Sequence, residues 1–315
     1  MSIKPALESY AKPKLPPVAV LGFGILAAST ASLFIRYAQQ DIPSLVIAAY
    51  RLSLATLLLT PVVLTRYRKE LMCLTARQVL LLCISGVFLA FHFAAWITSL
   101  QYTTVASSVV LVTTTPLWVA FLSPIILKEQ PGKAIWIGLL IALAGGTVVS
   151  LGQSCTVQIG HLHCPPFAEF VRAENFTGNL LALVGAWMAT GYMLIGRRLR
   201  SSLALTSYIY VVYGVAAVAL LLMVAMTGEK MVGYSPQSYL FCLALALIPQ
   251  LFGHSAYNWA LKYVSAVYVS VSLLGEPIGS TILALLFLNE TPTFLELGGG
   301  VLILAGIYLV TRNNP

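Results

Sequence analysis

One carboxylate lies in the middle of a long apolar stretch, residues 264–288. The stretch is long enough to cross a bilayer, because a membrane helix needs about 20 apolar residues. Glu276 is its only charged residue. A carboxylate there costs roughly 2.5–3.5 kcal/mol on insertion scales, so it needs a function or a partner. Gly275 and Pro277 beside it favour a break in the helix. A charge next to a helix break at this depth is typical of a binding site for a transported molecule.

A single arginine, Arg51, lies within another apolar stretch, residues 44–64. It is about eight residues from one end, or roughly 12 Å at the helical rise, and Glu276 is roughly 18 Å from the opposite end of its own stretch. Across a core of about 30 Å these depths nearly coincide, so the two side chains either pair or face one cavity. A guanidinium can bind a substrate carboxylate through two hydrogen bonds. The structural alternatives are a helix-locking ion pair and a side chain that snorkels to the interface.

Two histidines, His92 and His254, also lie in apolar stretches. A histidine titrates near neutral pH and can relay or sense a proton, whereas the alternative is a neutral ring hydrogen-bonded between helices. Apolar walls with a few convergent polar groups describe a small-molecule pocket. The further pocket candidates are Tyr50, Trp96, Trp187, Tyr257 and Asn258. No catalytic residue, metal site or cofactor motif is found, so the chain is predicted not to be an enzyme.

The composition indicates which elements hold these residues. Of 315 residues, 59% are hydrophobic and 9% are charged. A soluble domain carries about 25% charged residues, so the chain is predicted to be a polytopic membrane protein. An open sheet cannot span lipid, so we expect an all-α fold. Ten stretches are long enough to be membrane helices, at residues 18–34, 44–64, 79–100, 106–127, 134–151, 178–195, 203–226, 239–261, 264–288 and 294–310.

The basic residues predict the orientation. With the N-terminus inside, 14 Lys and Arg side chains fall on the inner side and 3 on the outer side, while Arg51 lies within a span. Positive charge is enriched in cytoplasmic loops, so both termini are predicted to be cytoplasmic. The net charge of +8 is then a sign of topology and not of nucleic-acid binding. The tail at residues 1–17 lacks the features of a signal peptide.

The chain repeats itself at a shift of 161 residues. Residues 91–149 align without gaps to 252–310, with 15 identities in 59 positions. Five spans per copy is an odd number, so the second copy enters the membrane from the opposite side, and such inverted repeats place substrate sites near the midplane. Matched pairs include Gly24/Gly185, Arg36/Arg197, Pro116/Pro277 and Glu129/Glu290, whereas Glu276 is matched by Thr115.

Ten spans in two inverted five-helix copies resemble the drug/metabolite transporter superfamily, specifically the EamA-type exporters. The residues that carry the resemblance are Arg51, Thr115-Pro116-Leu117, Glu276-Pro277 and the matched ends Leu127-Lys128-Glu129-Gln130-Pro131 and Leu288-Asn289-Glu290-Thr291-Pro292. The resemblance implies an α-helical carrier that works by alternating access and commonly exports amino acids or other small metabolites. It does not identify the substrate.

The predicted organisation is a cytoplasmic tail (1–17), a first EamA-like repeat (18–151), an external loop (152–177) and a second repeat (178–312). In the loop, a disulfide between Cys155 and Cys164 is favoured over a metal site that would include the histidines between them. Glu129 and Glu290 are interpreted as structural, because acidic residues and nearby prolines suit helix starts.

We therefore predict a secondary transporter that exports small metabolites across the inner (plasma) membrane of the cell. The alternatives are a carrier of nucleotide sugars or other organic anions, and a membrane sensor without flux. The expected partners are a small-molecule substrate and the lipid bilayer, with no nucleic acid. The oligomeric state, the coupling ion and the direction of net flux stay open.

Overall fold

The computed structural model describes residues 13, 15–154, 156–158, 161–163 and 174–312. The first half of the chain forms α1 (Pro17–Ser29), α2 (Ala31–Ala38), α3 (Ser44–Val62), the π-helical turn η1 (Val63–Tyr67), α4 (Arg68–Met72), α5 (Ala76–Tyr102), α6 (Val105–Val112), α7 (Thr115–Ile126) and α8 (Lys133–Ser154). A hairpin of β1 (Thr156–Gln158) and β2 (His161–His163) follows.

The second half forms a similar series of helices. They are α10 (Glu174–Arg200), α11 (Leu205–Thr227), α12 (Pro236–Leu245), the π-helical segment η2 (Ala246–His254), α13 (Ser255–Ala260), α14 (Ala266–Ser272), the 3-10 turn η3 (Leu273–Gly275), α15 (Glu276–Leu288) and α16 (Phe294–Arg312). Apart from the short hairpin, the elements of the described chain are helical, which confirms the predicted all-helical class.

Eight helical units in the described chain are long and apolar enough to cross a membrane. Two shorter apolar helices, Lys133–Val148 and Phe294–Gly306, coincide with the remaining two predicted spans. The eight long units are Pro17–Ala38, Ser44–Met72, Ala76–Tyr102, Val105–Ile126, Glu174–Arg200, Leu205–Thr227, Pro236–Ala260 and Ala266–Leu288. The count of ten transmembrane helices stays a prediction.

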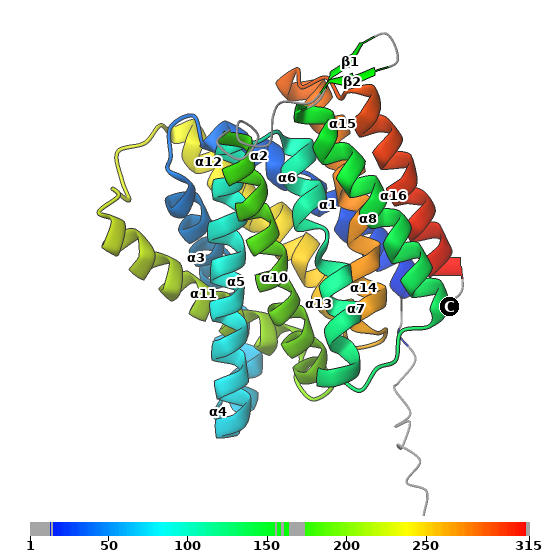
Figure 1. Cartoon of the computed structure of the whole chain (residues 1–315). Helices are drawn as coiled ribbons and strands as arrows, with labels where there is room; N and C mark the ends of the chain where they lie inside the picture. Colours follow the sequence, from blue (N-terminus) through cyan, green and yellow to red (C-terminus); the bar gives the residue numbers. More distant parts are fainter. Residues whose placement is uncertain (1–12, 14, 155, 159–160, 164–173, 313–315) are drawn as a thin grey trace, which may run out of the picture.

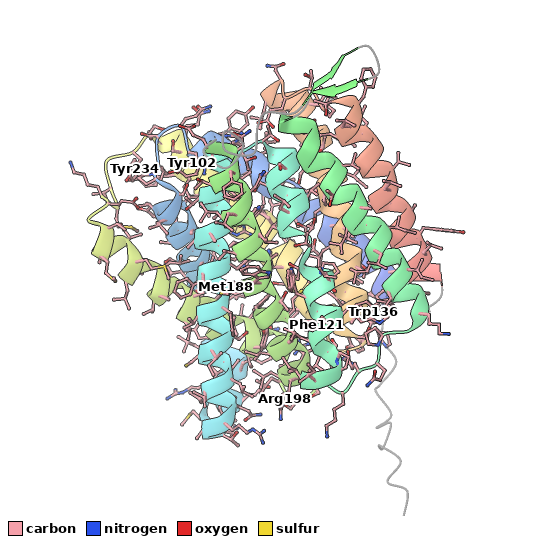
Figure 2. The ribbon with its side chains drawn as sticks, in the orientation of Figure 1. Tyr102, Phe121, Trp136, Met188, Arg198 and Tyr234 are labelled. Carbon is pink, nitrogen blue, oxygen red and sulfur yellow. The ribbon has the colours of Figure 1, made fainter. Side chains whose placement is uncertain are left out.

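The helices run between two ends of a bundle, which we call the hairpin face and the α4 face (Figure 1). The hairpin face carries β1 and β2, and Tyr102 and Tyr234 lie there (Figure 2). The α4 face carries α4 at the opposite end, with Arg198 nearby (Figure 2). The two halves of the chain are interleaved, because α10 packs along α5, α11 packs against α3 and α5, and α16 packs along α8.

Matching residues start several helices in the two halves. Thr75 and Ser235 precede α5 and α12, and Thr104 and Ser265 precede α6 and α14. Each hydroxyl oxygen accepts a hydrogen bond from a backbone N–H in the first turn, which satisfies a donor that the helix itself leaves unpaired. A further link on the hairpin face is Asp41, which accepts from the Ser235 N–H at 2.6 Å. This hydrogen bond lowers the pKa of the Asp41 carboxyl.

Glycines allow α8 and α16 to touch through their backbones. A Cβ atom at Gly145 would lie 2.5 Å from the Gly299 carbonyl oxygen, and one at Gly306 would lie 2.4 Å from that of Gly138. Gly145/Gly306 and Gly138/Gly299 are both matched at the shift of 161 residues. The contact is therefore reciprocal, as expected for two elements related by a pseudo-twofold axis. Small residues that let helices approach closely are typical of membrane interfaces.

Substituting alanine for Gly306 is expected to destabilise the protein by about 1–3 kcal/mol, because the new methyl group overlaps a backbone oxygen that cannot move aside. The measurement is thermal unfolding in detergent. Gly300→Ala on the same helix is the matched control, since a Cβ there meets no atom within 4 Å. An equal effect of the two substitutions would contradict this account of the helix contact.

Candidate functional site

A cavity lies inside the bundle and collects most of the polar residues from the apolar stretches. About 50 Å³ of it can hold the centres of water molecules. That is room for a few waters but not for a metabolite, since small-molecule pockets usually measure 300–1,000 Å³. The lining residues are Ala28, Ala31, Arg51, His92, Trp96, Val112, Thr113, Thr115, Ala189, Tyr192, Met193, His254, Tyr257, Asn258, Leu261, Leu273 and Glu276.

Arg51 reaches this cavity from α3 and is 0% exposed. Its Nε donates a hydrogen bond to Gln250 Oε1 at 2.7 Å. Its guanidinium carbon lies 4.1 Å from the centre of the Phe93 ring, a cation–π distance. No atom of the described chain accepts a hydrogen bond from either terminal nitrogen. Because a guanidinium keeps its charge, two such buried donors are costly unless a ligand accepts from them.

Glu276 is the first residue of α15 and lines the same cavity. Its carboxylate accepts a hydrogen bond from the Tyr257 hydroxyl at 2.7 Å. No ion pair within 4.0 Å joins Glu276 to Arg51 in the described chain. The two charged groups therefore share a cavity without neutralising each other directly, and Arg51 is not at an interface.

The backbone is interrupted just before Glu276. Helix α14 ends at Ser272, η3 follows over Leu273–Gly275, and α15 restarts with Pro277 at its second position. Proline suits that position because a backbone N–H in the first turn of a helix has no partner within the helix, so its absence costs no hydrogen bond. The matching site in the first repeat is similar, since α6 ends at Val112 and α7 restarts at Thr115 with Pro116 second. Glu276 and Thr115 thus stand at equivalent helix starts, and both line the cavity.

A π-helical segment, η2, brings a glutamine to Arg51. The interval between matching N-caps is one residue longer in the second repeat (Ser235 to Ser265) than in the first (Thr75 to Thr104). Single-residue insertions of this kind widen a helix locally and are frequent at functional sites. Pro249 lies inside η2, and Gln250 follows it. Sequence reasoning missed Gln250, although an isolated amide beside a proline in an apolar stretch is a usable signal.

The two histidines meet in the cavity, with ring centres 6.3 Å apart. His92 shares a 2.9 Å hydrogen bond with the Gly185 carbonyl through Nδ1. A carbonyl oxygen only accepts, so His92 Nδ1 is the donor and carries a proton. This bond fits the interpretation of His92 as a ring held between helices, while its place in the cavity wall leaves the proton-relay interpretation open.

Of the remaining candidates, Trp96, Tyr257 and Asn258 line the cavity, and Tyr50 and Trp187 do not. The Tyr50 hydroxyl donates to the Met231 carbonyl at 2.5 Å, and Trp187 is 40% exposed with its ring packed edge-on against Trp118. Each helical residue is rotated by about 100° from its neighbour. Tyr50 is next to the cavity residue Arg51 and therefore points elsewhere, and Trp187 is two residues before the cavity residue Ala189 and therefore faces away from it. Cys155 and Cys164 lie outside the described residues.

Replacing Gln250 by methionine is expected to raise the KM for substrate by about tenfold. The reason is that Arg51 Nε loses its acceptor and the guanidinium loses its fixed orientation, and a hydrogen bond to a charged group is worth about 1.5–3 kcal/mol. The measurement is the concentration dependence of initial transport rates. Gln40→Met, at an exposed position, is the control. An unchanged KM would mean that Gln250 does not position Arg51.

Comparisons with known proteins agree with the membrane character of the chain. Residues 17–151 and 176–312 each match the EamA-like transporter family. An uncharacterized transporter of Archaeoglobus fulgidus is 25% identical over 303 residues, covering 94% of this chain and 97% of that protein. Solute carrier family 35 member G1 of Mus musculus is 24% identical over 310 residues, covering 94% and 79%.

A further sequence relative and one solved structure are also similar to this chain. The uncharacterized transporter YdfC of Bacillus subtilis is 26% identical over 223 residues, covering 70% of this chain and 67% of that protein. One solved crystal structure has a TM-score of 0.69 at 20% identity and covers 95% of this chain and 97% of that chain. At that identity the likeness concerns the fold alone.

Proposed function

Because this chain belongs to the EamA-like transporter family and is therefore a membrane transporter, we propose that it exports small metabolites, amino acids or related compounds, by alternating access. Its place is the inner (plasma) membrane of the cell. The observation that carries this proposal is that two opposite charges line one buried cavity without forming an ion pair. Arg51 has two terminal nitrogens with no hydrogen-bond acceptor in the described chain, and Glu276 contributes its carboxylate. A small molecule with a carboxylate and an amine complements both groups.

The proposed topology has ten transmembrane helices, with α8 and α16 as the fifth and the tenth. Residues 18–151 and 178–312 form two inverted repeats, 152–177 form an external loop, and the tail at 1–17 and the C-terminus are cytoplasmic. The distribution of Lys and Arg supports this orientation. The reciprocal glycine contact between α8 and α16 supports the relation between the repeats. In this orientation the hairpin face is external.

The residues of the same cavity limit which substrates the protein can bind. Arg51, His92, His254, Trp96, Tyr257, Asn258 and Glu276 are the proposed substrate-binding residues. A carrier of nucleotide sugars or other organic anions is the second candidate. A multiply charged phosphate fits this cavity less well, because Arg51 is the only arginine or lysine among the described residues of the cavity wall. No nucleotide-binding motif is present, so an ion or substrate gradient supplies the energy.

The test is transport by the purified protein in liposomes. Labelled amino acids, monocarboxylates and a nucleotide sugar are supplied in turn, and accumulation is compared with that in empty liposomes. We expect at least one amino acid or monocarboxylate to cross faster. Selective movement of the nucleotide sugar would favour the second candidate, and no movement of any compound would favour a sensor without flux.

A further inference from the structure

Two Arg–Glu ion pairs join the halves of the chain at opposite faces of the bundle. On the hairpin face, Arg36 Nη2 lies 3.1 Å from Glu290 Oε1. On the α4 face, Arg197 Nε lies 2.7 Å from Glu129 Oε1. Both pairs are partly buried, with side-chain exposures of 27% and 27% in the first and 19% and 24% in the second. Each pair connects an arginine of one repeat with a glutamate of the other.

The second carboxylate oxygen of each glutamate caps a helix of the opposite repeat. Glu290 Oε2 accepts from the Val105 N–H at the start of α6, at 3.2 Å. Glu129 Oε2 accepts from the Ala266 N–H at the start of α14, at 3.4 Å. Negative charge at a helix N-terminus is stabilising. Glu129 and Glu290 were predicted to be structural residues suited to helix starts, and the helices that their carboxylates cap belong to the opposite repeat.

Each arginine also donates a hydrogen bond to a backbone carbonyl of its own repeat. Arg36 Nη2 donates to the Thr103 carbonyl at 3.2 Å, and Arg197 Nη1 donates to the Leu261 carbonyl at 2.7 Å. Both carbonyls lie a few residues before the capped helix, α6 or α14. We call the residues Arg36, Glu290 and Val105 the hairpin latch, and Arg197, Glu129 and Ala266 the α4 latch. Every member of one is matched to a member of the other at 161 residues.

Each latch is coupled by the chain to a helix break at the cavity. Glu129 closely follows α7, which starts at Thr115, and Glu290 closely follows α15, which starts at Glu276. The residue just before each glutamate, Lys128 or Asn289, has a left-handed backbone with φ of 59° or 56°. Apart from glycines, no other residue in the described chain has a positive φ. This turn directs each glutamate back toward the opposite repeat, so a tilt of α7 or α15 about its break would displace it.

Both latches are closed while the cavity is too small for a metabolite. On the hairpin face a polar pocket of about 470 Å³ has Arg36 and Glu290 in its wall. The hairpin latch therefore borders a space that is already open to one side of the protein. The latch joins α2 and α6 to the end of α15, and all three helices contribute residues to the wall of this pocket.

We propose that the two latches are alternating gates, so that the hairpin latch opens for the route to the hairpin face and the α4 latch opens for the route to the α4 face. The inference rests on the proposed transport by alternating access. The structure described above is then the occluded state, in which both gates are closed. Opening one gate leaves the other gate closed.

The test uses a variant without native cysteines and with one reporter, Ala189→Cys, whose position lines the cavity. A membrane-impermeant maleimide is applied to each side of vesicles in which the protein has one orientation. Arg36→Glu places two carboxylates together in the hairpin latch and is expected to raise the labelling rate from the hairpin side by about tenfold or more. Arg197→Glu is expected to do so only from the α4 side.

Side selectivity separates gating from a loss of structure. A variant that merely unfolds or loosens is labelled from both sides, which would overturn the proposal, as would two folded variants whose labelling stays at the parental rate. Arg198→Glu, at an exposed position next to the α4 latch, is the control and should leave both rates unchanged. The labelling needs no substrate. It can therefore succeed where every transport assay fails, and it can fail in a protein that transports normally.

Discussion

Arg51→Lys is expected to lower kcat/KM for transport by about 10- to 100-fold, although the charge is kept. An ammonium cannot keep the contact with Gln250 and also present two parallel donors to a carboxylate. The loss of one hydrogen bond to a charged group, about 1.5–3 kcal/mol, gives an effect of this size. The measurement is the initial rate in liposomes, normalised to the amount of inserted protein, for an amino acid or monocarboxylate found to be transported.

Stability provides a second measurement at Arg51. Two of its buried nitrogens have no hydrogen-bond acceptor in the described chain, so Arg51→Met should abolish transport while the free energy of unfolding changes by less than about 1 kcal/mol or increases. A structural arginine would behave in the opposite way, because its removal would break contacts that hold the helices together. Arg198→Lys is the control for the conservative change, since Arg198 is exposed at the α4 face (Figure 2).

Glu276→Gln is expected to lower the transport rate by about tenfold or more while the protein inserts and folds normally. The amide oxygen of glutamine can still accept the hydrogen bond from Tyr257, so the local geometry is kept and only the charge is lost. A substrate amine then loses its counter-charge in a buried site, where removing one partner of a charged pair typically costs several kcal/mol. The measurements are transport in liposomes and thermal unfolding in detergent.

Two further variants decide how the Glu276 result is interpreted. Glu174→Gln, an exposed residue at the start of α10, should have no effect on transport. Tyr257→Phe removes the donor that holds the carboxylate and should reduce transport less than Glu276→Gln does. Full activity of Glu276→Gln would remove Glu276 from the binding site, and a failure to insert would assign it to folding.

Several features of the site could be predicted because they depend on sequence patterns alone. Charges in apolar stretches identify Arg51 and Glu276 whatever the packing, since lipid and protein core both penalise them. The internal repeat aligns Pro116 with Pro277, and this alignment needs no knowledge of contacts. The rotation of a helix about its axis, which decides the side chains that face the cavity, could not be predicted in this way. A membrane helix faces lipid on one side and protein on the other, and both sides are apolar, so periodicity did not reveal that Trp187 and Tyr50 lie outside the cavity.

The sequence by itself determined that this is a helical membrane protein with an internal repeat, and it identified which ionisable groups lie in its spans. These properties follow from composition and from local order along the chain. Only the tertiary structure decided that Arg51 bonds to Gln250 and not to Glu276, and that Glu129 and Glu290 pair with arginines of the opposite repeat. Such partners lie more than 60 residues apart. They meet because close helix packing brings distant segments together, which no local pattern records.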